Sequence, residues 1–583
     1  MNLIKKFHLP TKTKKNYFSK CISVLILTAI FLFTTGYAYA GTTRYVDPGS
    51  PDPGNGYTSW NRAAHDIASA MSAMNGGDEL IIRDGTYTGA NNMLYHNIPS
   101  GPDENNYTVI RAEHDFGVII DAEIVDMRMP FRIQYGKYIE VHGIEFRRPG
   151  DMHSNQASSP VYIIKSDHIK LFRVGGVEVA LQARDISTYL DMSNIFTISQ
   201  SSYILLEECY AWGQGKYIFL TYSSDHIVLR RCISRQDGWV GGVGDNFSSY
   251  LSSYVEYQNN IAIDMDGPRH WHPDGSDALW GGFNMNGSAD NLEYNAFRGN
   301  IVMNITGLNG VTMYDGNRQR RSATYNPAFR LSASNGTCLM ENNAVINSVE
   351  GLMTYDNVDV KGFTAVNIYI DPDMMWSGTG VSHVTGNRPT IKNSVFANIA
   401  REAVAGIATN SDYNAFYGNA TNYSYTTPGS HDYSSQNGNH LNMIWSETNT
   451  SGGLKYPIRI ESDSNLSGKG EGSADIGANI TKRYGVNGTL YGESGYNTLT
   501  DVDLWPFPNE EIIRSRMKSY RYWDKNDNID YNNPDNPSTW ISGDRGFCAD
   551  GQTLTKYIWE SLGNSIPDDL YEKKPKITEI IID

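Results

Sequence analysis

Cysteine is scarce in this chain, with five among 583 residues. No two of them form a CxxC pair, which argues against a thioredoxin-like redox centre and against a zinc site. Cys209 and Cys232 occupy the same position of two similar phrases. Neighbouring strands lie about 4.8 Å apart, so this pair either forms a disulfide or stacks as two buried thiols.

Long apolar runs are also rare. The first forty residues hold six lysines, no acid, an apolar run from Cys21 to Phe33 and a final Ala38-Tyr39-Ala40. This pattern predicts a secretory signal peptide. The alternative is an uncleaved anchor, although the run is shorter than the roughly 20 residues of a membrane span. We expect an exported protein, secreted or on the cell surface, with no membrane segment after cleavage.

Positive charge is in the minority. Without the first forty residues, the 48 basic and 64 acidic residues become 42 and 64, a net charge of −22. Such a chain is unsuited to nucleic acid or to anionic membranes. An acidic polysaccharide can still bind where Ca²⁺ or a local basic patch bridges the charges. We expect the mature protein to be a monomer.

Short phrases recur along the middle of the chain. Residues 203–211 and 226–234 match position by position, and later copies keep an asparagine followed by two apolar residues. Units of this length, rich in β-branched residues, cannot bury their apolar side alone and must stack as a solenoid. We expect the stacked asparagines to bond one another and the backbone between coils. The later copies begin at Asn260, Asn300, Asn343, Asn393 and Asn414.

Turn-forming residues and changes of composition predict four regions of the chain. They are the signal peptide (1–40), an N-terminal cap (41–90) with a helix from Ala63 to Met74, the coils (91–420), and final strands with a C-terminal cap (421–583). Between 91 and 420, short strands with alternating aliphatic residues are separated by Gly, Asn, Asp and Ser, so the fold class is all-β.

The cap pattern from Tyr45 to Tyr87 and the coil phrases resemble right-handed parallel β-helix proteins of the pectate lyase-like superfamily. The resemblance covers residues 42–480. Within it, residues 232–239 and 259–267 resemble the calcium region of family 9 polysaccharide lyases. It implies a single-stranded right-handed parallel β-helix whose aspartates hold Ca²⁺ and in which a lysine on a later coil takes a proton.

The candidate calcium ligands are four aspartates. Asp237 and Asp264 are separated by about one coil, and Asp264 and Asp266 alternate along a strand, so their carboxylates can converge. Asp245, in a glycine-rich loop, can join them. Carboxylates gathered at one place repel unless a hard cation such as Ca²⁺ is shared among them. The alternative is that these Asp-Gly pairs are ordinary turns.

The base expected from the resemblance is missing, because no lysine stands between Lys216 and Lys361. The segment after the aspartates offers other groups, since histidine titrates near about 6.5 and arginine grips a carboxylate. Its alternatives are a loop packed on the coils, or a transition-metal site at the His-x-His pair. We predict Arg269, His270 or His272 as catalytic residues, and Trp239, Trp271, Lys216 and Arg298 as substrate contacts.

Together these features predict an exported lyase that cleaves a uronate-containing polysaccharide by calcium-assisted β-elimination. A non-catalytic β-helix that binds glycan or serves a structural or adhesive role is the alternative. A C5-epimerase shares the proton abstraction and stays open. Paired-carboxylate signatures of pectin hydrolases, phosphate loops and nucleophile elbows are missing from the sequence.

Overall fold

A computed structural model of the chain describes most of residues 41–570. Within that range it leaves out residues 96–97, 123–128, 151–158, 181–193, 214–216, 238, 241–242, 266–267, 271–278, 287–292, 306–312, 315–319, 322–326, 333–335, 373, 375–376, 435–452, 520 and 524–539. The chain divides into two compact units, residues 1–41 and 42–583. The predicted signal peptide falls outside the described residues. Among those described, no helix is long and apolar enough to cross a membrane.

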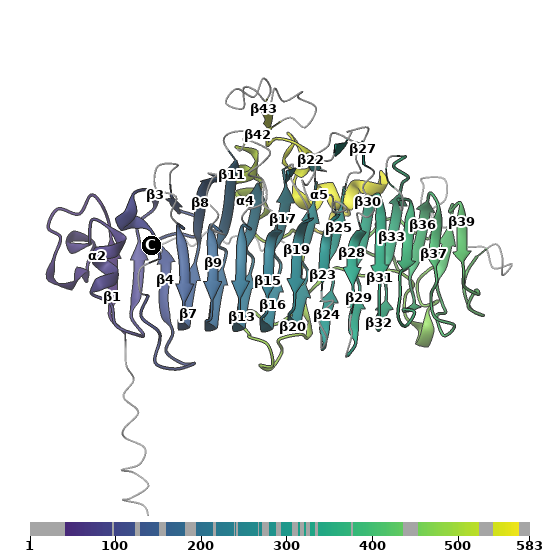
Figure 1. Cartoon of the computed structure of the whole chain (residues 1–583), viewed down its shortest axis with the longest axis horizontal. Coiled ribbons are helices and arrows are strands. Elements are labelled where there is room, and N and C mark those ends of the chain that lie inside the picture. Colours follow the sequence, from purple (N-terminus) through teal and green to yellow (C-terminus); the bar gives the residue numbers. More distant parts are fainter. Residues whose placement is uncertain are drawn as a thin grey trace, which may run out of the picture. The chain divides into compact units, whose positions relative to one another are not determined.

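Three long parallel sheets form the body of the second unit (Figure 1). Sheet A contains β1 (Thr43–Val46), β2 (Glu79–Ile82), β4 (Thr108–Ala112), β7 (Lys137–His142), β10 (Asp167–Phe172), β13 (Ser202–Glu207), β16 (Asp225–Arg230), β20 (Ser253–Gln258), β24 (Asn295–Arg298), β29 (Cys338–Glu341), β32 (Val358–Lys361) and β35 (Thr390–Lys392).

Sheet B follows sheet A along the chain in each coil. Its strands are β3 (Gly85–Tyr87), β5 (Val118–Asp121), β8 (Ile144–Gly150), β11 (Gly175–Ala180), β14 (Tyr210–Gly213), β17 (Ile233–Gln236), β21 (Ile261–Ile263), β25 (Ile301–Met303), β30 (Ala344–Ser348), β33 (Thr364–Ile368), β36 (Val395–Ile399) and β38 (Ala415–Tyr417).

Sheet C completes each coil and leads into the next strand of sheet A. It contains β6 (Phe131–Gln134), β9 (Val161–Ile164), β12 (Phe196–Ser199), β15 (Tyr217–Tyr222), β19 (Val243–Tyr250), β23 (Leu279–Asn286), β28 (Pro327–Leu331), β31 (Glu350–Thr354), β34 (Thr379–His383), β37 (Glu402–Ala405) and β39 (Thr421–Ser424). Successive strands of one sheet come from successive coils, so the predicted parallel β-helix is confirmed.

Outside these sheets lie four two-stranded pairs and three α-helices of the described chain. The pairs are β18 (Trp239–Val240) with β22 (Pro268–His270), β26 (Met313–Tyr314) with β27 (Arg320–Arg321), β40 (Lys482–Tyr484) with β41 (Leu499–Asp503), and β42 (Arg521–Trp523) with β43 (Trp540–Ser542). The helices are α2 (Ile67–Ser72), α4 (Glu510–Lys518) and α5 (Leu554–Trp559).

Stacked aromatic rings run through the core beneath sheet C. One phenylalanine per coil points inward, and neighbouring rings lie nearly parallel with centroids 4.6–5.0 Å apart. This spacing equals the distance between strands, so each ring buries its face against the next coil. The ladder consists of Phe196, Phe219, Phe247, Phe283 and Phe329.

The predicted asparagine ladder lies at the turn from sheet A to sheet B. The Oδ1 of Asn300 accepts from the backbone N–H of Asn260 at 3.0 Å and from its Nδ2 at 3.1 Å. Asn343 repeats both bonds toward Asn300, at 2.9 and 3.0 Å. All three residues are buried. Polar groups at this turn are thus satisfied between coils, as the repeat predicted.

The first coils already contain the region predicted as an N-terminal cap. Strands β1, β2 and β3 belong to sheets A and B, so the solenoid begins near residue 43 rather than 91. Helix α2 is shorter than the predicted span of 63–74 and places Ile67, Ala70 and Met71 in the apolar core.

The C-terminal segment packs along the side of sheet B instead of ending beyond the last coil. Phe547 and Trp559 share an apolar cluster with Ile233 and Ile261 of β17 and β21. In Figure 1, α4 and α5 lie beside the strands of sheet B. The tail therefore covers the middle coils, which are far from it in sequence.

Cys209 and Cys232 are free and buried, as are Cys338 and Cys548. The Sγ of Cys232 donates to the backbone carbonyls of Arg230 and Leu206, at 3.5 and 3.6 Å. Burial raises the pKa of the Cys232 thiol well above its usual value. The pair therefore stacks as thiols, which settles the choice that the sequence left open.

Candidate functional site

Asp237 follows strand β17 and is fully buried. Its Oδ1 lies 3.0 Å from Nε of Arg235 and 2.7 Å from Nη2 of Arg545, which belongs to the C-terminal segment. Two guanidinium groups neutralise this carboxylate. A calcium ion here would sit against both arginines in a buried site, where unpaired like charges cost several kcal/mol. The prediction of Asp237 as a metal ligand does not fit these partners.

Asp264 lies one coil further along and meets the same part of the tail. Its Oδ1 accepts from Nδ2 of Asn304 at 2.8 Å, and its Oδ2 accepts from the backbone N–H of Phe547 at 3.1 Å. Gly546 is so close that an added Cβ would meet Oδ2 at 1.8 Å. The space that an ion would need beside this carboxylate is therefore filled by backbone.

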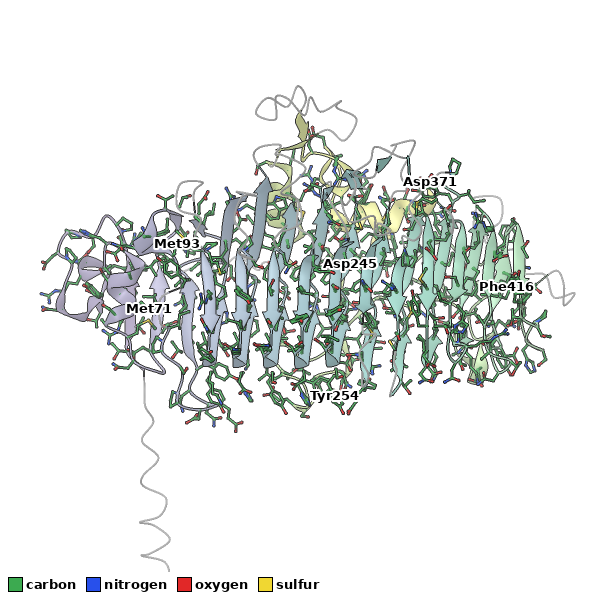
Figure 2. The ribbon with its side chains drawn as sticks, viewed as in Figure 1. Met71, Met93, Asp245, Tyr254, Asp371 and Phe416 are labelled. Atoms are coloured by element: carbon green, nitrogen blue, oxygen red, sulfur yellow. The ribbon has the colours of Figure 1, made fainter. Side chains whose placement is uncertain are left out.

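Asp245 is in strand β19 of sheet C, not in the predicted loop, while Asp237 and Asp264 border sheet B. Figure 2 labels Asp245 on the middle coils. Asp266 lies outside the described residues. The three described aspartates do not form a group of metal ligands. The turn from sheet B to sheet C separates Asp245 from the other two, so the described residues do not bring the predicted ligands together, and calcium binding stays a prediction.

Arg298 was predicted to contact substrate, but it lies on sheet A and is fully engaged. Its Nε lies 3.2 Å from Glu256, its Nη1 pairs with Glu341, and its Nη2 donates to the hydroxyl of Tyr294 at 2.8 Å. Sheet A and sheet C face away from each other around one core. Arg298 therefore does not belong with the residues of sheet C.

The other predicted residues lie in the connections from sheet B to sheet C. Strands β18 and β22 pair in parallel there, with Trp239 beside Pro268 and Val240 beside His270. The backbones of Trp239, Arg269 and His270 are thus brought together, and their roles stay predictions. Lys216, Trp271 and His272 lie outside the described residues.

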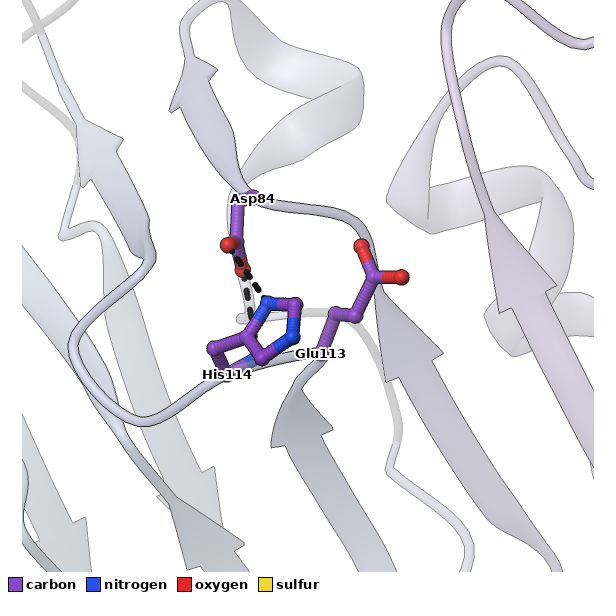
Figure 3. A group of neighbouring side chains, drawn as sticks. All are labelled: Asp84, Glu113 and His114. Carbon is purple, nitrogen blue, oxygen red and sulfur yellow. Dashed lines mark hydrogen bonds and ion pairs between the residues drawn. The ribbon is translucent and has the colours of Figure 1, made fainter. Parts of the chain in front are cut away.

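One group of three potential metal ligands occurs among the described residues, on the first coils (Figure 3). Its ligand atoms, from Asp84, Glu113 and His114, lie within 4.8 Å of one another. Asp84 accepts from the backbone N–H of His114 at 3.1 Å and bonds its Nδ1 at 2.8 Å. Asp84 and His114 are exposed. These two bonds account for the group without an ion.

The outer face of sheet C carries a row of polar side chains on neighbouring strands. Ser248, Asn284 and Arg330 are register partners on β19, β23 and β28. Each directly follows a phenylalanine of the core ladder. Side chains alternate between the two faces of a strand, so these three point away from the core.

Polar atoms in this row lack partners. Ser248 Oγ, Asn284 Oδ1 and Arg330 Nη1 are buried, and none has a hydrogen-bond partner among the described residues. The other amino group of Arg330 is held, because Nη2 donates to the hydroxyl of Tyr355 at 3.1 Å. Buried polar groups are nearly always paired, so three unpaired atoms in one row are a polar layer whose hydrogen bonds the described residues do not complete.

Asp245 and Tyr217 border this row as register partners on β19 and β15. The Oδ2 of Asp245 accepts from Nδ2 of Asn284 at 2.8 Å. Burial raises the pKa of Tyr217 well above its usual value, and the Asp245 carboxylate raises it further, whereas Arg330 lowers it. Tyr217 therefore keeps its proton at neutral pH and can donate a hydrogen bond.

Sequence reasoning missed four of these residues, although a local signal exists. In Phe247-Ser248, Phe283-Asn284 and Phe329-Arg330, a core phenylalanine is followed by a polar residue. In a half-buried strand the residue after an inward aromatic points outward. Aligning the coils on these phenylalanines would have placed Ser248, Asn284 and Arg330 in one row. The same alternation gives no signal for Tyr217, which stands two residues before the inward Phe219.

The chain is distantly similar to several solved structures. No family model and no curated protein matches the chain. The mannuronan C-5 epimerase A-module of Azotobacter vinelandii is 13% identical, over 62% of this chain and 90% of that one, with a TM-score of 0.29. A family 6 alginate lyase is 10% identical, over 63% and 52%, with a TM-score of 0.36. The surface adhesin PfbA of Streptococcus pneumoniae is 11% identical, over 66% and 93%, with a TM-score of 0.35.

This chain is a parallel β-helix protein. The strand pairing of its three sheets shows this directly. The resemblance to family 9 polysaccharide lyases stays a prediction. We therefore argue the function of this β-helix from its own side chains.

Proposed function

We propose that this β-helix binds an acidic polysaccharide along the outer face of sheet C and cleaves it by β-elimination. The observation that carries the proposal is the unpaired Nη1 of Arg330, in one register row with the unpaired oxygens of Ser248 and Asn284. An arginine takes a carboxylate through parallel N–H donors, and hydroxyl and amide groups bond sugar hydroxyls.

In this proposal Arg330 takes the role that the sequence analysis gave to calcium. β-Elimination draws a proton from carbon 5 of a uronate, and negative charge then builds on the carboxylate. A guanidinium placed against that carboxylate stabilises the charge where it develops. The net negative charge of the chain makes such a local cation necessary for an acidic ligand.

β-Elimination needs one group that accepts a proton and another that donates one. A base takes the proton from carbon 5, and the electron pair forms the double bond between carbons 4 and 5. The bond from carbon 4 to the glycosidic oxygen then breaks, and that oxygen takes a proton. We assign the donor to Tyr217, whose raised pKa keeps it protonated. We assign the acceptor to His270 of β22, in the connection that leads into β23. Histidine is the side chain that most often accepts a proton near neutral pH.

The decisive experiment offers the mature protein a panel of uronate polysaccharides. We expect the ultraviolet absorbance of an unsaturated uronate product to rise, and to rise equally with calcium or with a chelator. An unchanged absorbance with a changed ratio of uronate epimers would replace the lyase by an epimerase. Binding without either change would leave a glycan-binding β-helix, and no binding to any member of the panel would overturn the proposal.

Tyr217→Phe removes only the phenolic oxygen. We expect kcat to fall about 10- to 150-fold, the value of one hydrogen bond to a developing charge at about 1.5–3 kcal/mol, with KM nearly unchanged. Tyr425→Phe is the matched control, because Tyr425 is 85% exposed. Initial rates across a range of substrate concentrations measure both constants. Equal rates for the two variants would remove Tyr217 from the mechanism.

A further inference from the structure

A second arginine stands on the same outer row of sheet C, near the beginning of the sheet. Arg132 of β6 pairs in register with Tyr162, which pairs with Thr197 of β12. The row continues through Leu220 to Ser248 and on to Arg330. Six strand steps of about 4.8 Å place Arg132 about 29 Å from Arg330 along the coils.

Arg132 is available to a ligand. It is half-buried, no side-chain hydrogen bond or ion pair joins it to a described residue, and its charge acts to lower the pKa of the neighbouring Tyr162. Other arginines in or beside the strands of sheet A pair with acids. Arg111 lies 2.7 Å from Glu79, and Arg173 lies 2.7 Å from Asp115. An arginine left without an acid is unusual in a chain with more acids than bases.

A cavity of about 250 Å³ adjoins Arg132. Its described lining contains no acid and includes Tyr95, Gln134 and Tyr135. The Nζ of Lys165 lies 5.8 Å from the ring centre of Tyr135, which adds a second cation beside the cavity. A hollow with a free guanidinium, aromatic rings and an amide has the composition of a site for one acidic sugar.

The row between the two arginines carries no carboxylate. Its members are Tyr162, Thr197, Leu220, Ser248 and Asn284. Thr197, Leu220, Ser248 and Asn284 are buried and uncharged, so this row does not repel an acidic chain that passes over it. A polymer that follows the coil axis therefore meets a cation at each end of the row.

We propose that the Arg132 cavity is a second carboxylate subsite for the same acidic glycan chain that Arg330 binds. This rests on the proposed function of sheet C. The subsite adds affinity only for chains long enough to reach both arginines, since two linked contacts bind with a high effective concentration of the second. A short oligosaccharide bound at Arg330 does not reach the Arg132 subsite.

The test compares Arg132→Gln, Arg330→Gln and the control Arg62→Gln, in a long polyuronate and in a trisaccharide, by isothermal titration. Arg62 is an exposed arginine whose nearest acid is 4.0 Å away. We expect Arg132→Gln to raise Kd for the polymer about 10-fold or more, as for a lost charge-assisted bond, and to leave Kd for the trisaccharide unchanged. Arg330→Gln should weaken both ligands.

The outcomes separate the two proposals. If Arg330→Gln weakens the polymer and Arg132→Gln does not, the second subsite is overturned and the first stands. An equal loss on both ligands from Arg132→Gln also overturns it, because a remote contact cannot act on a trisaccharide. If the unmodified protein binds neither ligand, the proposed function fails as well.

Discussion

Arg330→Ala should lower kcat/KM on the acidic polysaccharide by about 100- to 1,000-fold, the usual cost of one lost donor to a developing oxyanion. The variant removes the guanidinium that pairs in register with Asn284, which in turn pairs with Ser248. Arg330→Lys keeps the charge but loses the planar fork, so we expect an intermediate loss. Initial rates of the ultraviolet assay measure both.

Two controls test whether the loss of activity is specific to Arg330. Arg62→Ala removes an exposed arginine from the first coils and should leave the rate unchanged. Circular dichroism and Tm check the fold, because the guanidinium of Arg330 lies 5.2 Å from the ring centre of Tyr355 and the two side chains pack together. If Arg330→Ala folds and cleaves the polysaccharide as fast as Arg62→Ala, sheet C is not the catalytic face.

Asp237→Ala should loosen the C-terminal segment by about 3–5 kcal/mol, the range for removing one partner of a buried ion pair. The change leaves Arg235 charged and fully buried, with its Nη1 still 2.9 Å from the carbonyl of Gly543. We expect hydrogen exchange of the amides at 543–548 to accelerate, since local opening sets their protection. Strands of the first coils should keep their protection.

The control for this variant is Asp569→Ala. Asp569 pairs with Arg459 at 3.1 Å, but its side chain is 62% exposed, and such surface pairs contribute about 0–1 kcal/mol. The same experiment distinguishes the arginine pairing from a calcium site. If Asp237 held calcium, a chelator would accelerate exchange in the unmodified protein and have no further effect on Asp237→Ala. We expect no effect of chelator on either.

The solenoid could be predicted from the sequence because its signals are local and repeated. Asn260, Asn300 and Asn343 follow one rule at each turn, and each satisfies the backbone of the coil before it. The inward phenylalanines obey the same periodicity. A pattern that every coil repeats can be recognised even where one coil departs from it. Each coil adds a similar stacking contribution to the stability of the solenoid.

The calcium site could not be judged from the sequence, although the spacing of its aspartates was sound. Asp237 and Asp264 do meet one short segment, residues 545–547, from adjacent coils. What spacing could not reveal was that the segment belongs to the tail. Arg545 is 308 positions beyond Asp237. Nothing near either residue in the chain predicts that contact.

By itself, the sequence determined the parallel β-helix and its inward and outward faces, because one strand period and one turn rule govern all coils. Only the tertiary structure decided which charged side chains are paired and which are not. Docking of the tail neutralises Asp237 and fills the space beside Asp264, while Nη1 of Arg330 on sheet C has no hydrogen-bond partner among the described residues. The physical reason is that a buried charge takes the nearest opposite charge in space, whatever their separation along the chain.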